Sequence, residues 1–172
     1  MKINLFFLIL LLFIGCTPKT TISTKISCPT VLFAAEHKKF FTSNTKTISV
    51  ENISYRAEIN NYAFNNDCSI VNDAFQAELS LLFIVKPNKI EEGNITLPFY
   101  VAILNPSDEL LDMQYYRIND SFQKESVSGN YIETELIQRI KLQMPFLNDQ
   151  KYSSIKVVVG FMLDKIKLEI LN

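Results

Sequence analysis

Residues 75–85, FQAELSLLFIV, alternate apolar with other side chains until Pro87 and Asn88 end the run. Successive side chains of a β-strand point to opposite faces, so a period of two predicts a strand with one buried face. Leu82 and Ile84 add apolar side chains to the second face, which is typical of a strand covered on both sides. This stretch therefore predicts a long strand in a packed sheet.

Strand signals continue on both sides of this stretch. Apolar runs or alternating patterns cover residues 30–34, 53–59, 95–104, 109–118, 132–144 and 155–163. The segment 105–108, NPSD, is a turn and predicts a hairpin between its two neighbours. Pro98 lies within one strand, which indicates an edge position or a bulge because proline donates no ladder hydrogen bond.

Helix is weakly indicated. Residues 34–41, AAEHKKFF, begin like a helix but end in residues that favour strands. Asp164 is a candidate cap for a short final helix over residues 166–171, although a strand fits nearly as well. About seven short strands with few helices predict an all-β fold, a Greek-key or immunoglobulin-like β-sandwich. The chain has no tryptophan, so we expect sandwich architecture rather than membership of the immunoglobulin family.

The amino terminus carries an apolar segment with a basic start. Lys2 precedes residues 3–14, which are apolar apart from Asn4, and Gly15 and Cys16 follow. A membrane-spanning helix needs roughly 20 residues, whereas this length and basic start are typical of a secretory signal peptide. An uncleaved signal anchor is the alternative, which the short span disfavours.

The segment Leu12-Phe13-Ile14-Gly15-Cys16 resembles the lipobox of bacterial lipoproteins, with Phe13 where that motif prefers leucine. The resemblance implies a signal peptide over residues 1–15, cleavage after Gly15, and acyl chains on Cys16 that hold the protein to a membrane. Thr17 in place of aspartate implies the periplasmic face of the outer membrane. Residues 16–27 would then form the lipidated cysteine and a flexible stem, because 17–27 are rich in Thr, Ser and Lys without apolar periodicity.

Two cysteines remain after Cys16. An even pair in an exported chain predicts one disulfide, here between Cys28 and Cys68. A zinc site would need His37, the only histidine, but no C-x-x-C and no second histidine accompany it. We therefore expect no metal and no cofactor. The formal net charge of -1 also gives no support to nucleic-acid binding, which needs a basic patch. The single domain is expected to span residues 28–172.

Other candidate chemistry has a plainer explanation in each case. His37 beside Glu36 suggests acid–base work, but a surface histidine in a charged turn explains it as well. Glu133 and Glu135 would share one strand face about 7 Å apart, near the separation of glycosidase carboxylates, yet a solvated face explains them better. The tyrosines 100, 115 and 116 lie on neighbouring strands and would form an aromatic contact patch, or else belong to the core and rim.

Residues 28–40, 97–104 and 157–163 resemble segments of a family of bacterial envelope lipoproteins that has no assigned activity. This resemblance adds no functional residue beyond Cys16. We expect a membrane-anchored, non-enzymatic binding or structural module in the periplasm. The alternative is an accessory subunit of an outer-membrane or transport assembly complex that docks by strand pairing at the Pro98 edge. A hydrolase is the third hypothesis, which the lack of a recognisable catalytic motif disfavours.

Overall fold

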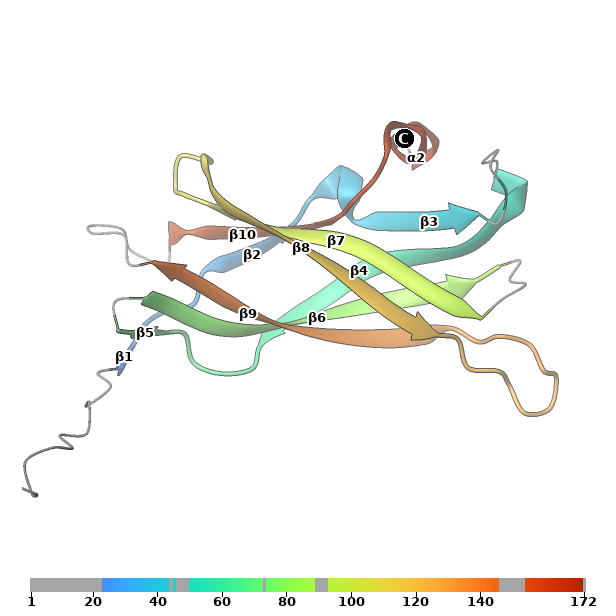
Figure 1. Cartoon of the computed structure of the whole chain (residues 1–172), viewed down its shortest axis with the longest axis horizontal. Helices are drawn as coiled ribbons and strands as arrows, with labels where there is room; N and C mark the ends of the chain where they lie inside the picture. Colours follow the sequence, from blue (N-terminus) through green and yellow to red (C-terminus); the bar gives the residue numbers. More distant parts are fainter. Residues whose placement is uncertain are drawn as a thin grey trace, which may run out of the picture.

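The computed structural model describes residues 23–43, 45, 50–72, 74–88, 93–145 and 154–171. The predicted signal peptide (1–15), Cys16 and the first part of the predicted stem lie outside these residues. Within them the chain is nearly all β, and two sheets pack face to face around one hydrophobic core, as the sequence predicts (Figure 1).

The larger sheet has six strands, and the strand that contains residues 75–85 lies at its centre. It consists of β1 (Ser23–Lys25), β3 (Lys39–Ser43), β4 (Ile53–Phe64), β5 (Ser69–Val71), β6 (Ala74–Pro87) and β9 (Thr134–Pro145). Strand β6 pairs with β4 and β5 on one side and with β9 on the other, always antiparallel. Its alternating residues from Phe75 to Val85 are all buried, at most 8% exposed. The predicted inward face is therefore confirmed.

The smaller sheet has four strands in the order β2-β10-β7-β8. Its members are β2 (Thr30–Phe33), β10 (Lys156–Phe161), β7 (Asn94–Leu104) and β8 (Leu110–Ser121). Strands β7 and β8 form the predicted hairpin, and the side-chain oxygen of Asn105 accepts hydrogen bonds from the backbone of Ser107 and Glu109, both at 2.9 Å. Strand β2 pairs in parallel with β10, so the two ends of the domain lie side by side.

The seven strands expected from the sequence are all present, and three short ones, β1, β3 and β5, were missed. The sequence 34–41 forms one 3-10 turn, η2 (Ala35–His37), followed by β3. A second 3-10 turn, η3 (Val50–Asn52), precedes β4.

The final segment is a helix, α2 (Lys165–Leu171), rather than a strand. The carboxylate of Asp164 accepts a hydrogen bond from the backbone N–H of Lys167 at 2.9 Å, which is the cap that the sequence suggested. Among the described residues no helix is long and apolar enough to cross a membrane.

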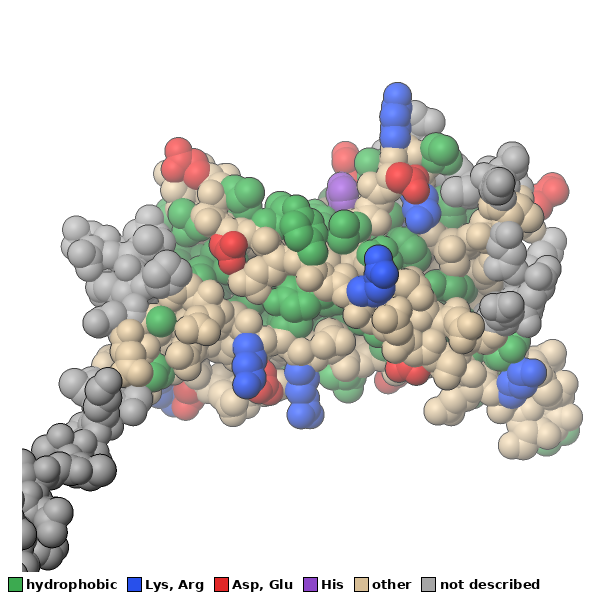
Figure 2. Space-filling model, viewed as in Figure 1, with side chains coloured by type: hydrophobic (Ala, Val, Ile, Leu, Met, Phe, Trp, Pro, Cys, Tyr) green, Lys and Arg blue, Asp and Glu red, His purple; other side chains and the backbone are tan. Residues whose placement is uncertain are grey.

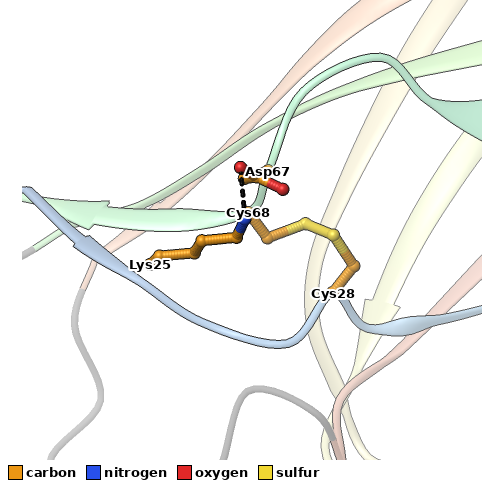
Figure 3. Close-up of a disulfide and its surroundings, with 4 residues drawn as sticks. All are labelled: Lys25, Cys28, Asp67 and Cys68. Atoms are coloured by element: carbon orange, nitrogen blue, oxygen red, sulfur yellow. Dashed lines mark ion pairs between the residues drawn. A yellow bond between two sulfur atoms is a disulfide. The ribbon is translucent and has the colours of Figure 1, made fainter.

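The prediction of a flexible stem over the whole of 16–27 is wrong for residues 23–27. Strand β1 pairs antiparallel with β5, and the N–H of Ile26 donates to the carbonyl of Cys68 at 2.8 Å. Backbone pairing does not need an apolar pattern, which is why the sequence did not reveal it. The predicted disulfide joins Cys28, between β1 and β2, to Cys68, just before β5 (Figure 3).

The prediction that Pro98 marks an edge or a bulge is confirmed only in part, because β7 is an interior strand without a bulge here but Pro98 lies just past its last pair with β10. Strand β7 lies between β10 and β8, and Pro98 is in regular register with Arg117. Strand β10 ends at Phe161, opposite Phe99, so the absent N–H of Pro98 costs no ladder bond to β10. The carbonyl of Pro98 still accepts a hydrogen bond from the N–H of Met162 at 3.0 Å. An interior strand tolerates proline here because its neighbour has ended.

Beyond the end of β10, the backbone of β7 is satisfied from the opposite sheet. The hydroxyl of Tyr55, on β4, donates to the carbonyl of Thr96 and accepts from its N–H, both at 2.9 Å. Tyr55 is 5% exposed. Burial raises the pKa of this phenol, and the hydrogen bond to the Thr96 backbone opposes that rise. This side chain is therefore a polar link between the two sheets.

Phenylalanine rings fill the space between the sheets. The ring of Phe83 lies 5.2 Å from that of Phe99 and 5.7 Å from that of Phe161, measured between centroids. Phe40 packs 5.3 Å from Phe161 on the other side. Because side chains alternate along a strand, the residues before and after each of these core positions point to the outer face of the sheet.

Candidate functional site

The outer face of the four-stranded sheet carries two cross-strand rows of uncharged residues. In the first row, Val158 of β10 is the register partner of Leu32 on β2 and of Ala102 on β7, and Ala102 is opposite Met113 on β8. In the second row the register partners are Gly160, Tyr100 and Tyr115. We call these seven residues the outer apolar face.

The residues of these rows lie on the side of the sheet that faces away from the core, and two of them, Ala102 and Gly160, are covered by their neighbours and buried. Their sequence neighbours on β7 and β10, Val101, Val157 and Val159 among them, are fully buried. By contrast Leu32 is 44% exposed and Tyr115 63% exposed. Figure 2 shows hydrophobic side chains along the upper surface of that view, over β10 and β7. No element of the described chain covers the side chains of Leu32 and Tyr115.

Tyr100 is held in place by contacts below and beside it. Its hydroxyl would lie 2.6 Å from a Cβ built on Gly160, so the absence of a side chain there makes room for the phenol. The ring of His37, at the end of η2, packs edge-on against Tyr100 with centroids 5.7 Å apart. The Nδ1–H of His37 donates to the carbonyl of Phe161 at 2.9 Å, which orients the imidazole. Burial raises the pKa of the Tyr100 phenol.

The three tyrosines singled out in the sequence divide between the two faces of the sheet. Tyr100 and Tyr115 are direct register partners on the outer apolar face. Tyr116 turns inward, where its ring stacks on Phe99 with centroids 5.2 Å apart and an angle of 17° between the planes. Its hydroxyl donates to the side-chain oxygen of Gln114 at 2.6 Å. The aromatic patch thus contains two of the three residues.

The outer face of the six-stranded sheet differs in charge. Glu78 lies opposite Lys141, and Arg139 opposite Ser80, so charged residues of both signs are interspersed along β6 and β9. Ile137, which is 68% exposed, is the main apolar exception.

An open groove of about 640 Å³ lies on the six-stranded sheet, where β3, β4 and β6 meet. Basic and acidic side chains both line it, among them Arg56, Glu58, Lys86 and Glu133. Glu58 pairs with Lys38 and Glu133 with Lys86, both at 3.0 Å. Its charges are thus largely paired within the protein, and we assign it no ligand.

The candidate catalytic residues do not come together. His37 contacts a backbone carbonyl and a tyrosine ring, and it does not line the groove. Glu133 forms an ion pair with Lys86 on the charged sheet face, as expected for a solvated position, and Glu135 is exposed. Within the described ranges, no group of three or more His, Cys, Asp or Glu side chains is arranged to hold a metal ion.

Sequence reasoning missed Leu32, Met113 and Val158 as surface residues. Leu32 and Val158 occur in short continuous apolar runs, and such runs are typical of strands covered on both faces. These side chains reach the surface because no other element of the described chain covers them. An apolar run in the sequence does not indicate whether another element will cover it.

Comparison of the chain with protein-family models, curated protein sequences and solved structures finds no match.

Proposed function

We propose that the protein is a lipid-anchored, non-enzymatic binding module of the bacterial cell envelope, held by acyl chains on Cys16 at the periplasmic face of the outer membrane. The lipobox-like segment that ends at Cys16 supports the anchor. The outer apolar face supports the binding role, and it is the observation that carries this proposal.

The outer apolar face has the composition of a contact surface. None of its seven residues is charged, and protein interfaces are depleted in charge at their centre and enriched in tyrosine and methionine. Exposed apolar patches on a folded domain are typical of interaction sites. On this face Leu32 and Tyr115 are exposed, and Tyr100, Met113 and Val158 are half-buried. Exposed Tyr115 beside the immobilised Tyr100 provides an anchor of the kind that contributes most to binding energy.

The second candidate function is an accessory subunit of an envelope assembly complex that pairs strands with its partner. Strand β8 favours it, because within the described part of the chain it pairs only with β7 and so leaves one edge open. Strand addition would then take place at β8 rather than at Pro98.

The anchor is tested by fractionating cells that express Cys16→Ser. We expect the variant to leave the membrane fraction or to accumulate as an uncleaved precursor, because no thiol is present for acylation. A variant that is processed normally and stays in the membrane would refute the anchor.

The binding face is tested by cross-linking in intact cells followed by extraction in detergent. The variant Leu32→Ser Tyr115→Ala removes the two most exposed side chains of the outer apolar face, and Ile137→Ser is the matched control on the opposite sheet. We expect the parent and Ile137→Ser to yield the same cross-linked species and the double variant to lose it. Equal yields from all three proteins, or no adduct from the parent, would contradict the proposal. A parent that is extracted in a stable complex would favour the accessory-subunit candidate.

A further inference from the structure

The amino-terminal end of the described chain is attached to the domain at one edge of the six-stranded sheet. Strand β1 pairs with β5 over three residues, and Lys25 forms an ion pair with Asp67 at 2.6 Å. The disulfide between Cys28 and Cys68 lies directly beside this pair (Figure 3).

The non-covalent part of this attachment is weak. All three residues of β1 are exposed, so the strand buries no side chain. The side chains of Lys25 and Asp67 are 71% and 67% exposed, and ion pairs in that setting contribute little. Ile26, which is partly buried against the core, is the one apolar contact that the described residues before Cys28 make with it. A short exposed strand pair does not offset the conformational entropy lost when the chain is ordered.

The chain that follows each of the two cysteines is held firmly. Pro29, directly after Cys28, is buried. After Cys28, β2 pairs with β10, and Val31 is buried in the core. Cys68 is fully buried, and β5, which follows it, forms a hairpin with β6. The disulfide therefore joins the loosely attached residues before Cys28 to the part of the domain that strand pairing and the hydrophobic core stabilise.

We propose that residues 23–28 form a redox-controlled clasp: the Cys28–Cys68 disulfide holds them on β5, and reduction by a dithiol releases them while the two sheets stay packed. One thiolate of the dithiol attacks the sulfur of Cys28, which is only partly buried, and Cys68 leaves as a thiolate that takes up a proton. The second thiol of the dithiol then attacks the mixed disulfide. Cys28 is freed as a thiol, and the reductant becomes a disulfide with the loss of two electrons.

Release would stop at Pro29, which is buried and directly precedes β2. The six residues 23–28 span at most about 22 Å when extended. If Cys16 is anchored as proposed, reduction lengthens the link between membrane and domain by up to that distance. The release itself does not depend on the anchor.

The clasp is tested by hydrogen exchange on the full chain in detergent, with and without dithiothreitol. We expect the amide of Ile26 to exchange at least about tenfold faster after reduction, while amides of β6 keep their protection. Trypsin should then cut after Lys25 in the reduced protein only. The variant Cys28→Ala Cys68→Ala should show the same pattern without reductant.

Two further variants of the oxidised protein separate the disulfide from the other contacts. Asp67→Asn removes the ion pair and Ile26→Ala removes the apolar contact, and both should keep the amide at position 26 protected. Release in either oxidised variant would overturn the proposal. So would retained protection at Ile26 after reduction, or loss of β6 protection together with it, because the disulfide would then hold the core rather than the clasp. None of these results bears on membrane anchoring.

Discussion

Replacing Tyr115 and, separately, its neighbour Tyr116 by alanine distinguishes the outer apolar face from the core. The two substitutions make the same chemical change at adjacent positions of β8. Tyr115 is 63% exposed, whereas Tyr116 is partly buried and stacks on Phe99. We expect the first change to impair binding without affecting stability, and the second to impair stability alone.

The sizes of the two effects follow from these surroundings. Truncating a fully buried aromatic side chain to alanine costs about 3–5 kcal/mol. Tyr116 is only partly buried, so we expect Tyr116→Ala to lower the free energy of unfolding by about 2 kcal/mol. The stacking on Phe99 accounts for about 1 kcal/mol of this loss. Tyr115→Ala should cost less than about 0.5 kcal/mol, as exposed substitutions usually do.

Urea unfolding followed by circular dichroism measures the stability difference. With a slope of about 2 kcal/mol per molar urea, Tyr116→Ala should lower the midpoint by about 1 M and Tyr115→Ala by less than about 0.25 M. Cross-linking in cells should give the reverse order. Loss of an interface tyrosine should reduce the adduct at least about fivefold, and Tyr116→Ala should keep the adduct while it is folded.

Two results would refute this reasoning. Midpoint shifts that are equal, or larger for Tyr115→Ala, would show that the two side chains are not on opposite faces. An adduct that persists at the parental yield in Tyr115→Ala would remove the outer apolar face from the contact.

Three further predictions concern the links between and within the sheets. Tyr55→Phe should lower the free energy of unfolding by about 1–3 kcal/mol, because it leaves the N–H and carbonyl of Thr96 without their partner; an unchanged urea midpoint would contradict it. Because the folded-state pKa of Tyr55 is raised above 10.0 by burial, its contribution to stability should be full below that pH and fall as pH rises through the raised pKa. Urea midpoints measured across that range, with Tyr55→Phe as the less sensitive reference, check the sign. Gly160→Ala should cost about 1–3 kcal/mol, because its Cβ would lie 2.6 Å from the hydroxyl of Tyr100; thermal melting tests it, and a melting temperature equal to that of the parent would show that Tyr100 does not rest on residue 160.

The strands and their inward faces could be predicted because alternation is a local property. Each apolar residue from Phe75 to Val85 points to the core whichever strand pairs with β6. The cap at Asp164 is equally local, since it needs only the N–H of Lys167 three residues later. The disulfide was predicted from the number of cysteines, on the expectation that the chain is exported.

Pairing partners and strand ends could not be predicted in the same way. Pro98 indicated an edge strand, yet it lies in an interior strand, which tolerates it because β10 ends beside it. Strand β1 looked like part of a stem, yet it pairs through its backbone alone. Both outcomes depend on segments far away in the chain, and no pattern within the segment itself reports them.

Spacing and composition are enough to predict the fold class, the inward faces of the long strands and the pairing of two cysteines, because each is a property of the chain itself. That Tyr100 and Tyr115 are neighbours on an outer face, and that Tyr116 stacks in the core, follows only from how the strands pair in three dimensions. The fold also places charged residues of both signs across the outer face of the six-stranded sheet, whereas the seven residues of the outer apolar face carry none and are flanked by Arg117 and Lys156. A period of two places a residue on one side of its strand. The register between strands decides which residues are its neighbours on that side, and the packing of other elements decides whether that side is buried or exposed.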